Sequence, residues 1–322
     1  MRGVGIAIVT HNSEAEVGAC LDAALASRAE IVVVDNASTD QTRREVLRRT
    51  GVRLISNPWN RGFAAAANQA IDALEQPYVL LLNPDAVPLG GLGALVEALS
   101  ERWTAAAGGK LVDELGRPQA GFAVRRFPSG LALALETLGV NRLWPGNPVN
   151  RRYRCLDLNL EAAAEVEQPA GAFMMIRRKV WQELGGFDEL FHPLWFEDVD
   201  FCRRAREAGY RLRYVPSAVA RHRGAHSAGK LSPLDRQLYW YDSLLKYAAK
   251  HLGLAARWVT CLAVVLRSVV RAIMGIFLLR GRQALSVHGR IIRLAARCLV
   301  SGRRQGGRLS PAYQHQGGSR HR

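Results

Sequence analysis

The first third of the chain alternates apolar runs with helical segments, and this alternation restricts the fold more than any other feature. Four apolar runs have the composition of buried strands, namely residues 4–10, 30–36, 52–57 and 78–85. Between them, apolar residues recur at helical spacing in residues 13–26, 38–50 and 62–76. Continuous apolar strands that alternate with helices predict a parallel sheet covered by helices on both faces.

Polar side chains follow three of these strands. They are Thr10, His11 and Asn12 after the first strand, Asp35 and Asn36 after the second, and Asn83 and Asp85 after the fourth. Ligands of open α/β sheets bind at the carboxyl ends of the strands, so we expect these residues to gather at one edge. Each acid also has a simpler interpretation, because Asp35 suits a turn before a helix and Asp85 suits an Asn-Pro-Asp turn.

The stretch "LWFEDVDFC", from Leu194 to Cys202, places three carboxylates among aromatic and apolar residues. An unpaired carboxylate is costly to bury, so Glu197, Asp198 and Asp200 are expected to meet water, cations or a polar substrate. Asp198 has a second interpretation as an acid in the first turn of a helix, where the helix dipole stabilises it.

Several motifs that indicate other chemistries are absent from the sequence. It contains no GxGxxG, no Walker A lysine motif and no HExxH, which argues against a dinucleotide fingerprint, a phosphate loop and a zinc protease. Its five cysteines include no CxxC pair, so neither a zinc site nor a disulfide framework is indicated. A reducing, cytosolic compartment is expected.

The net charge of +16 is concentrated at the carboxyl end of the chain. From Ala225 onward the chain has 17 of its 44 Lys+Arg and 2 of its 28 Asp+Glu. The first 224 residues therefore have 27 basic and 26 acidic side chains. We therefore expect a nearly neutral domain at residues 1–230 and a basic helical region at 231–300. A disordered basic tail is expected at 301–322, where Gly, Ser and Arg predominate.

The basic helical region favours contact with a membrane surface. Its longest uncharged run is Trp258 to Leu266, nine residues, whereas a spanning helix needs about 20. We therefore favour amphipathic helices in the membrane interface over a hairpin that partly inserts, and both over a helix packed on the preceding domain. Five arginines are expected to face anionic headgroups, namely Arg280, Arg282, Arg290, Arg293 and Arg297.

The order of several motifs resembles that of the family 2 glycosyltransferases, in particular the rhamnosyltransferase-like branch. The resemblance covers about residues 4 to 230 and is carried by "IVTHN", "VVVDNASTD", "NRGFAAAANQAI", "LLNPDAV", "GAFMMIRR", "GGFDELF", "FEDVDFCRRAREAGYRLRYVPSAV" and "HRGAHS". It implies the A-type glycosyltransferase fold, a single Rossmann-like α/β domain with a mostly parallel central sheet, followed here by C-terminal amphipathic helices. Residues 1–89 would form the nucleotide-sugar-binding half and residues 90–230 the acceptor side.

The resemblance also implies roles for individual residues. The implied donor-nucleotide residues are Thr10, Asn12, Asp35 and Asn36, with Asn60, Gly62 and Asn68 around the adjacent loop. Asp35 would accept the imide N–H of uracil or thymine. Asp85 and His222 would bind a divalent metal, Mg²⁺ or Mn²⁺, although "NPDAV" holds one Asp where the family has an Asp-x-Asp element.

The acceptor side is assigned in the same way. Asp198 resembles the family's general base, and Glu197 would bind the acceptor sugar or orient the loop. Gly171 and Ala172 would form the floor of the acceptor site, with Trp195 either beside it or in the core. Asp200 is expected to pair with Arg203 or Arg204.

The expected activity is inverting transfer of a sugar from a nucleoside-diphosphate donor, with dTDP-L-rhamnose favoured, to a lipid-linked (polyprenyl diphosphate) saccharide. The protein is expected to act as a peripheral enzyme on an anionic surface, the cytoplasmic face of the inner membrane. A nucleotidyltransferase that makes nucleotide sugars is the alternative. A nucleic-acid-binding protein is the third interpretation, but its basic residues lack interleaved aromatic side chains, so no specific nucleic acid is expected.

Overall fold

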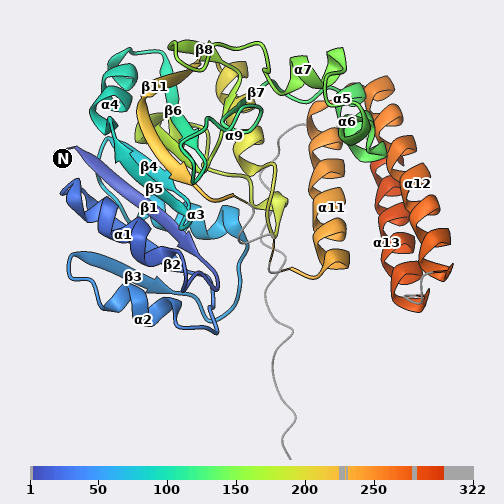
Figure 1. Cartoon of the computed structure of the whole chain (residues 1–322), viewed down its shortest axis with the longest axis horizontal. Helices are drawn as coiled ribbons and strands as arrows, with labels where there is room; N and C mark the ends of the chain where they lie inside the picture. The colour runs from blue at the N-terminus through green and yellow to red at the C-terminus, as the bar shows by residue number, and fades with distance from the viewer. Residues whose placement is uncertain (1–2, 225–228, 230, 278–280, 301–322) are drawn as a thin grey trace, which may run out of the picture.

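The computed structural model of the chain describes residues 3–224, 229, 231–277 and 281–300 (Figure 1). The predicted disordered tail at 301–322, Arg280 and part of the "HRGAHS" motif lie outside these residues, as does the side chain of Arg282.

The predicted α/β fold is confirmed. Nine strands of the described residues form one sheet, in the order β3 (Val52–Ser56), β2 (Glu30–Asp35), β1 (Val4–Thr10), β4 (Tyr78–Leu82), β10 (Phe173–Arg177), β6 (Thr104–Val112), β11 (Arg211–His222) and β5 (Ala86–Gly90), with β8 (Ala164–Val166) paired to β11. The first four strands are parallel. Next to them β10 runs antiparallel to both β4 and β6.

Helices cover both faces of this sheet (Figure 1). On one face lie α1 (Val17–Ala26), α2 (Thr42–Leu47) and α4 (Leu92–Ser100), and on the other lie α3 (Phe63–Asp72), α8 (Arg178–Glu183) and α9 (Glu197–Glu207). Successive side chains of a strand point to opposite faces, so Ile6 and Ile8 of β1 join the first layer while Ala7 and Val9 join the second.

The middle of the chain is more regular than the sequence indicates. Its strand β6 lies near the centre of the sheet, although "TAAAGGKLV" is rich in Ala and Gly, which are poor strand formers. The remaining elements are the short ribbon β7 (Val124–Arg125) and β9 (Gln168–Pro169), the helices α5 (Gly130–Leu138), α6 (Val140–Leu143) and α7 (Pro148–Tyr153), and the 3₁₀ turn η1 (Glu189–Phe191).

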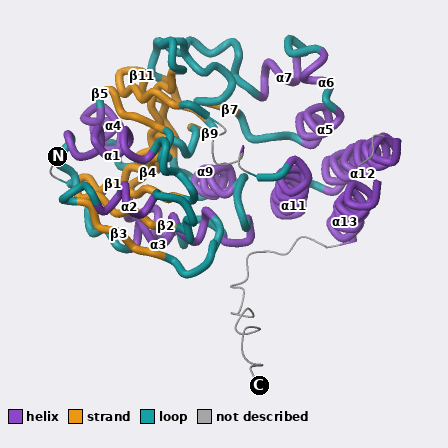
Figure 2. Tube along the Cα trace, turned by 60° about the horizontal axis from the view of Figure 1, so that its bottom comes forward, coloured by secondary structure: helices purple, strands orange, loops and turns teal. Residues whose placement is uncertain are grey.

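Three long helices follow the sheet: α11 (Pro233–His251), α12 (Leu254–Phe277) and α13 (Gly281–Val300). They lie side by side, with α11 between the α/β domain and the other two (Figure 2). Apolar side chains of α11, including Leu244 and Tyr247, share one buried cluster with Phe196 and Val199 at the start of α9. The first of the basic helices is thus packed on the α/β domain, which was the alternative that the sequence favoured least.

Candidate active site

The carboxyl ends of β1 and β2 form the first wall of the site. Thr10 and Asp35 are paired in register at the ends of these strands. The Asp35 carboxylate is fully buried and accepts hydrogen bonds from Thr10 Oγ1 at 3.1 Å, Ser38 Oγ at 2.5 Å and Ser38 N at 3.1 Å. Asn12, in the loop after β1, accepts a hydrogen bond with its Oδ1 from Thr39 N, in the loop after β2, at 2.8 Å. The predicted nucleotide residues therefore tie two strand-end loops together.

Asn36 organises the second wall. Its Nδ2 donates to Asn60 Oδ1 at 2.9 Å and to the carbonyl of Gly62 at 3.1 Å, and its Oδ1 accepts from Arg61 N at 3.0 Å. Gly62 has a φ of +82°, which a side chain rarely adopts, and an added Cβ would lie 2.7 Å from the His192 ring. The loop from Asn60 to Gly62 is thereby fixed beside the segment that leads into the acidic stretch.

Asp85 and His222, 137 positions apart in sequence, meet at the end of the sheet. His222 is the last residue of β11 and pairs with Ala86 of β5, which places its Nε2 3.5 Å from Asp85 Oδ1. Both side chains are almost fully buried, with 2% and 7% of their surface exposed. Gln119 Nε2 donates to the carbonyl of His222, so its Oε1 faces His222 Nδ1 at 3.0 Å as an acceptor.

This geometry fits a cation between the two side chains. With Nδ1–H donating to Gln119, the Nε2 lone pair of a neutral imidazole points at a carboxylate oxygen, and two acceptors that face one another need a cation. Burial lowers the pKa of His222, which favours the neutral ring. Among the described residues no group of three or more His, Cys, Asp or Glu side chains is placed to bind a metal. A metal here would need further ligands from a substrate.

Asp198 lies on the other side of the same sheet end. Residues 83–85 follow β4 and residues 171–172 precede β10, and because these strands are antiparallel neighbours the two segments meet, with Asn83 N donating to the carbonyl of Ala172 at 3.0 Å. The Gly171 N–H donates to Asp198 Oδ2 at 3.1 Å. Burial raises the pKa of Asp198, and this N–H bond opposes the rise.

The residues before Asp198 are held in an unusual backbone conformation. Trp195 and Phe196 have φ angles of +77° and +72°, which are strained for bulky side chains. Phe196 is buried, and its ring lies 5.3 Å from those of Trp240 and Tyr247 on α11, while Trp195 is half-buried against Trp240. The packing of α11 thus maintains the strained turn from which α9 begins.

Glu197 is buried, and one of its carboxylate oxygens, Oε2, has no hydrogen-bond partner in the described part of the chain. Burial raises the pKa of Glu197 well above its usual range, and the charge of Asp198 adds to this rise. A neutral Glu197 can donate a hydrogen bond beside Asp198, so the two acids have different properties because of their surroundings.

Asp200 has a structural position, as predicted. Its carboxylate has no exposed surface and contacts Arg204 Nε at 2.8 Å, Lys250 Nζ at 2.6 Å and His251 Nε2 at 2.6 Å. The predicted pairing with Arg204 is therefore confirmed. The contacts with Lys250 and His251 join α9 to α11, and they could not be inferred from the sequence because 50 residues separate the partners.

Three residues that the sequence did not single out connect the two sides of the site. Gln119 contacts His222, and the Phe122 ring stacks on the His222 ring with a centroid distance of 5.0 Å. The Arg125 guanidinium lies 5.6 Å from the Phe122 ring centroid, and its charge lowers the pKa of Asp198 against the effect of burial. The segment 119–125 lacks a motif, so only its place in the fold identifies it.

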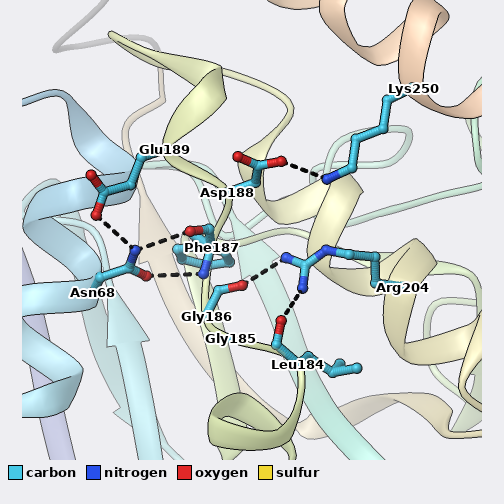
Figure 3. Close-up of a pocket in the computed structure, with 9 residues that line it drawn as sticks. All are labelled: Asn68, Leu184, Gly185, Gly186, Phe187, Asp188, Glu189, Arg204 and Lys250. Atoms are coloured by element: carbon cyan, nitrogen blue, oxygen red, sulfur yellow. Dashed lines mark hydrogen bonds and ion pairs between the residues drawn. The ribbon is translucent and has the colours of Figure 1, made fainter. Parts of the chain in front are cut away.

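Asn68 lies beside the "GGFDE" loop, where its side chain faces Phe187 and Glu189 (Figure 3). Its amide bonds both backbone groups of Phe187 and the carboxylate of Glu189, and so fixes the "GGFDE" loop. This loop borders an open pocket of about 340 Å³ that Arg204 and Lys250 also line. In this structure Asn68 therefore positions the loop that leads towards the acidic stretch, and its predicted place beside the nucleotide remains a prediction.

Family profiles match most of this architecture. The profile of "Glycosyl transferase family 2" matches residues 5–185, and that of "Glycosyl transferase family group 2" matches residues 159–296. The second match extends through α11 and α12 into α13, so the sequence of the long helices is part of this family match.

Curated relatives and solved structures agree with these profiles. The N-acetylglucosaminyl-diphospho-decaprenol L-rhamnosyltransferase of Mycobacterium tuberculosis is 30% identical over 243 residues, which span 69% of this chain and 76% of the relative. Rhamnosyltransferase WbbL of Escherichia coli is 25% identical over 266 residues, 79% of this chain and 96% of the relative.

Two solved structures share the fold. Mannosyltransferase PcManGT from Pyrobaculum calidifontis, in complex with GDP-Man and Mn²⁺, has a TM-score of 0.53 at 18% identity and covers 92% of this chain and 87% of its own. TarS of S. aureus, in complex with UDP-GlcNAc, has a TM-score of 0.51 at 17% identity, with coverage of 92% and 81%. The profile match over more than half of the chain, the rhamnosyltransferase relatives and the sheet-end site together show that this chain belongs to glycosyl transferase family 2 and is a glycosyltransferase of the rhamnosyltransferase-like type.

Proposed function

We propose that this glycosyltransferase moves L-rhamnose from dTDP-L-rhamnose to a hydroxyl of a lipid-linked saccharide, with inversion at the anomeric carbon. The observation that carries the proposal is the position of Asp198, a half-buried carboxylate at the same sheet end as the Asp85–His222 pair. Membership in the family replaces the nucleotidyltransferase and nucleic-acid-binding interpretations.

Asp198 would act as the general base. As the acceptor hydroxyl attacks the anomeric carbon, its proton passes to Asp198, the new glycosidic bond forms and the bond from the sugar to the diphosphate breaks. The Gly171 N–H holds Oδ2 in place, so Oδ2 is oriented before the substrate arrives. One direct displacement inverts the anomeric configuration. The neutral Glu197 would donate a hydrogen bond to an oxygen of the acceptor sugar.

The leaving nucleoside diphosphate needs compensating positive charge. Asp85 and His222 would hold a divalent ion, and Mn²⁺ suits a ligand pair of one carboxylate and one imidazole better than Mg²⁺ does. When bound, the ion would act as a Lewis acid on the diphosphate.

The nucleotide would lie along the carboxyl ends of β1 and β2. Asp35 would position the hydroxyl groups of Thr10 and Ser38 beside the nucleotide, because its carboxylate accepts a hydrogen bond from each of them. Oδ1 accepts from both hydroxyl groups and Oδ2 accepts from Ser38 N, so a lone pair of Oδ2 could still accept the imide N–H of thymine. The choice of rhamnose rests on the names of the curated relatives.

A membrane surface is the proposed location of the lipid-linked acceptor. The outer face of α12 is apolar and exposes Trp258, Leu262, Leu266 and Ile273, whereas that of α13 exposes Arg290, Arg293 and Arg297. By length and hydropathy, Leu254–Gly275 of α12 could cross a membrane. A spanning pair would carry the exposed arginines of α13 into the hydrocarbon, which is costly, so we propose that both helices lie in the membrane interface.

The proposal is tested with purified enzyme, dTDP-L-rhamnose and Mn²⁺, with donor binding and transfer to a polyprenyl-diphosphate saccharide measured separately. Asp198→Asn keeps the shape of the side chain and should bind the donor normally while turnover falls about a hundredfold or more. A matched Asp157→Asn change, at an exposed surface acid, should alter neither quantity. Normal turnover in Asp198→Asn would remove Asp198 as the base. Binding of UDP-GlcNAc or GDP-mannose in place of the rhamnose donor would overturn the choice of sugar.

A further inference from the structure

The inner side of α12 carries two arginines that have no acidic partner among the described residues. Arg267 and Arg271 lie one helical turn apart and both are half-buried. Among the described residues neither guanidinium is ion-paired or hydrogen-bonded, and the Nε of Arg267 is fully buried. Partial burial removes water from these cations, and a hydrogen-bonding anion would replace the lost hydration.

Side chains from the neighbouring helices surround these arginines. Tyr241 of α11 and His288 of α13 are both buried, and Arg271 is close enough to act on the pKa of each. His288 Nδ1 and Ser268 Oγ are also buried and have no partner within the described part of the chain. Among the described residues, unpaired polar groups of α12 and α13 are therefore buried between two helices that pack together, beside Arg271.

Among the described residues no carboxylate is ion-paired with Arg267 or Arg271, and Glu136 of α5, which packs on α12, is paired with Arg154 at 3.0 Å. No Asp or Glu follows Asp242 in the sequence. Asp242 pairs with Lys246 at 2.6 Å, and Asp235 is bonded to Ser232 at the start of α11. The guanidinium of Arg267 approaches Gly139 at the C-terminal end of α5, and the partial negative charge of that helix end offsets part of one positive charge.

We propose that Arg267 and Arg271, with Tyr241, Ser268 and His288, form a binding site for a phosphate group between α11, α12 and α13. A phosphate oxygen accepts the N–H donors of guanidinium forks well, and the hydroxyl groups and imidazole N–H would occupy its remaining oxygens. The site is separate from the proposed donor site at Asp85 and His222. The phosphate can come from a free anion or from a membrane lipid. Only the lipid source rests on the membrane contact proposed above.

The first experiment measures the thermal unfolding of the full-length protein with inorganic pyrophosphate. EDTA is present, and sodium chloride at equal ionic strength is the reference. A hundredfold excess over Kd should raise Tm by at least about 2 °C. The rise should persist in Asp85→Ala, which damages the donor site, and in the control pair Arg290→Gln/Arg293→Gln on the exposed face of α13. It should disappear in Arg267→Gln/Arg271→Gln.

A second measurement uses the wild-type protein only, so it does not depend on the folding of a variant. Phenylglyoxal modifies accessible arginines, and peptide mass spectrometry reports the extent at each one. Pyrophosphate should protect Arg271 at least threefold and leave Arg293 unprotected. If vesicles of phosphatidylglycerol protect Arg271 and vesicles of phosphatidylcholine do not, the bound phosphate comes from an anionic lipid. The same protection by pyrophosphate but by neither vesicle identifies a free anion.

Two results would overturn the proposal. One is a Tm rise in Arg267→Gln/Arg271→Gln equal to that of the wild type, which would place the anion elsewhere. The other is modification of Arg271 at the same rate with pyrophosphate and with each kind of vesicle as without them. Neither result bears on sugar transfer, which is measured with the donor and Mn²⁺, so the two proposals fail separately.

Discussion

Replacing Asp200 with Asn tests how strongly the C-terminal helix α11 is joined to α9, the helix that carries Asp198. The carboxylate of Asp200 has no exposed surface and lies within 2.8 Å of nitrogen atoms on Arg204, Lys250 and His251. Burial raises the pKa of Asp200, but the hydrogen bond with His251 and the charges of Arg204 and Lys250 outweigh this effect and lower the pKa from 3.8 to about 2. Asn keeps the shape, removes the charge and leaves Arg204 and Lys250 without their shared carboxylate.

The expected loss can be worked out in two ways. A fall in pKa from 3.8 to about 2 corresponds to roughly 2.5 kcal/mol in favour of the folded, ionised form. Removing one partner of a buried ion pair costs about 3–5 kcal/mol. We therefore expect Asp200→Asn to lower the free energy of unfolding by about 3 kcal/mol at pH 7. Because the folded pKa is the lower one, the wild type holds this stabilisation above about pH 4 and loses it as pH falls towards 2.

Urea unfolding followed by circular dichroism, at pH 7 and at steps down to pH 2.5, measures both quantities. Asp242→Asn is the matched control, since Asp242 pairs with Lys246 within α11 where both side chains are partly exposed, and it should cost under about 1 kcal/mol. A loss below 1 kcal/mol in Asp200→Asn would refute the inference that this cluster joins α11 to α9. Turnover should fall with stability, because the Asp198 turn rests on α11.

Four further outcomes are expected. Gly171→Ala would place a Cβ 3.1 Å from Asp198 Oδ2, so turnover should fall at least tenfold with donor affinity kept, and an unchanged rate would show that Asp198 is not held there. The kcat/KM profile should lose activity on acidification at a higher pH than an ordinary Asp would give, since burial raises the pKa of Asp198, and a midpoint at or below pH 3.8 would contradict this. His222→Ala should abolish Mn²⁺-dependent donor binding while circular dichroism stays unchanged, and retained binding would exclude the Asp85–His222 site. Leu262→Glu/Leu266→Glu should weaken sedimentation with anionic vesicles at least fivefold, whereas Leu115→Glu, at an exposed turn outside the long helices, should not.

The first four strands could be predicted from the sequence because their formation depends on the local pattern of apolar residues. Each is a short apolar run between helical segments, and such runs can be buried only inside a sheet covered on both faces. The polar residues at their ends then fall at one edge by geometry, which is why Thr10, Asp35 and Asn36 could be placed together before any contact was known.

The central strand β6 shows where such rules fail. Gly108 and Gly109 lower its strand propensity, yet they are required there, because a Cβ at Gly109 would lie 2.3 Å from the Phe173 ring and one at Gly108 would lie 2.4 Å from Pro169. The need for small residues comes from neighbours about 60 positions away in sequence. Local propensity contains no information about those neighbours.

In the candidate site, too, one part could be predicted from the sequence and another part could not. The sequence, with its family resemblance, identified Asp198, Asp85 and His222 as a set, because acids at strand ends and a C-terminal histidine occur in the expected order. Only the tertiary structure decided what surrounds them: the Gly171 N–H on Asp198, the Gln119 amide that fixes His222, and the cations of α11 around Asp200. Burial and the charges of distant segments determine the pKa of a carboxylate, and a sequence does not state which segments will be adjacent. The chain order therefore determined which groups are available for chemistry, and the fold determined the distances and surroundings that set their protonation and roles.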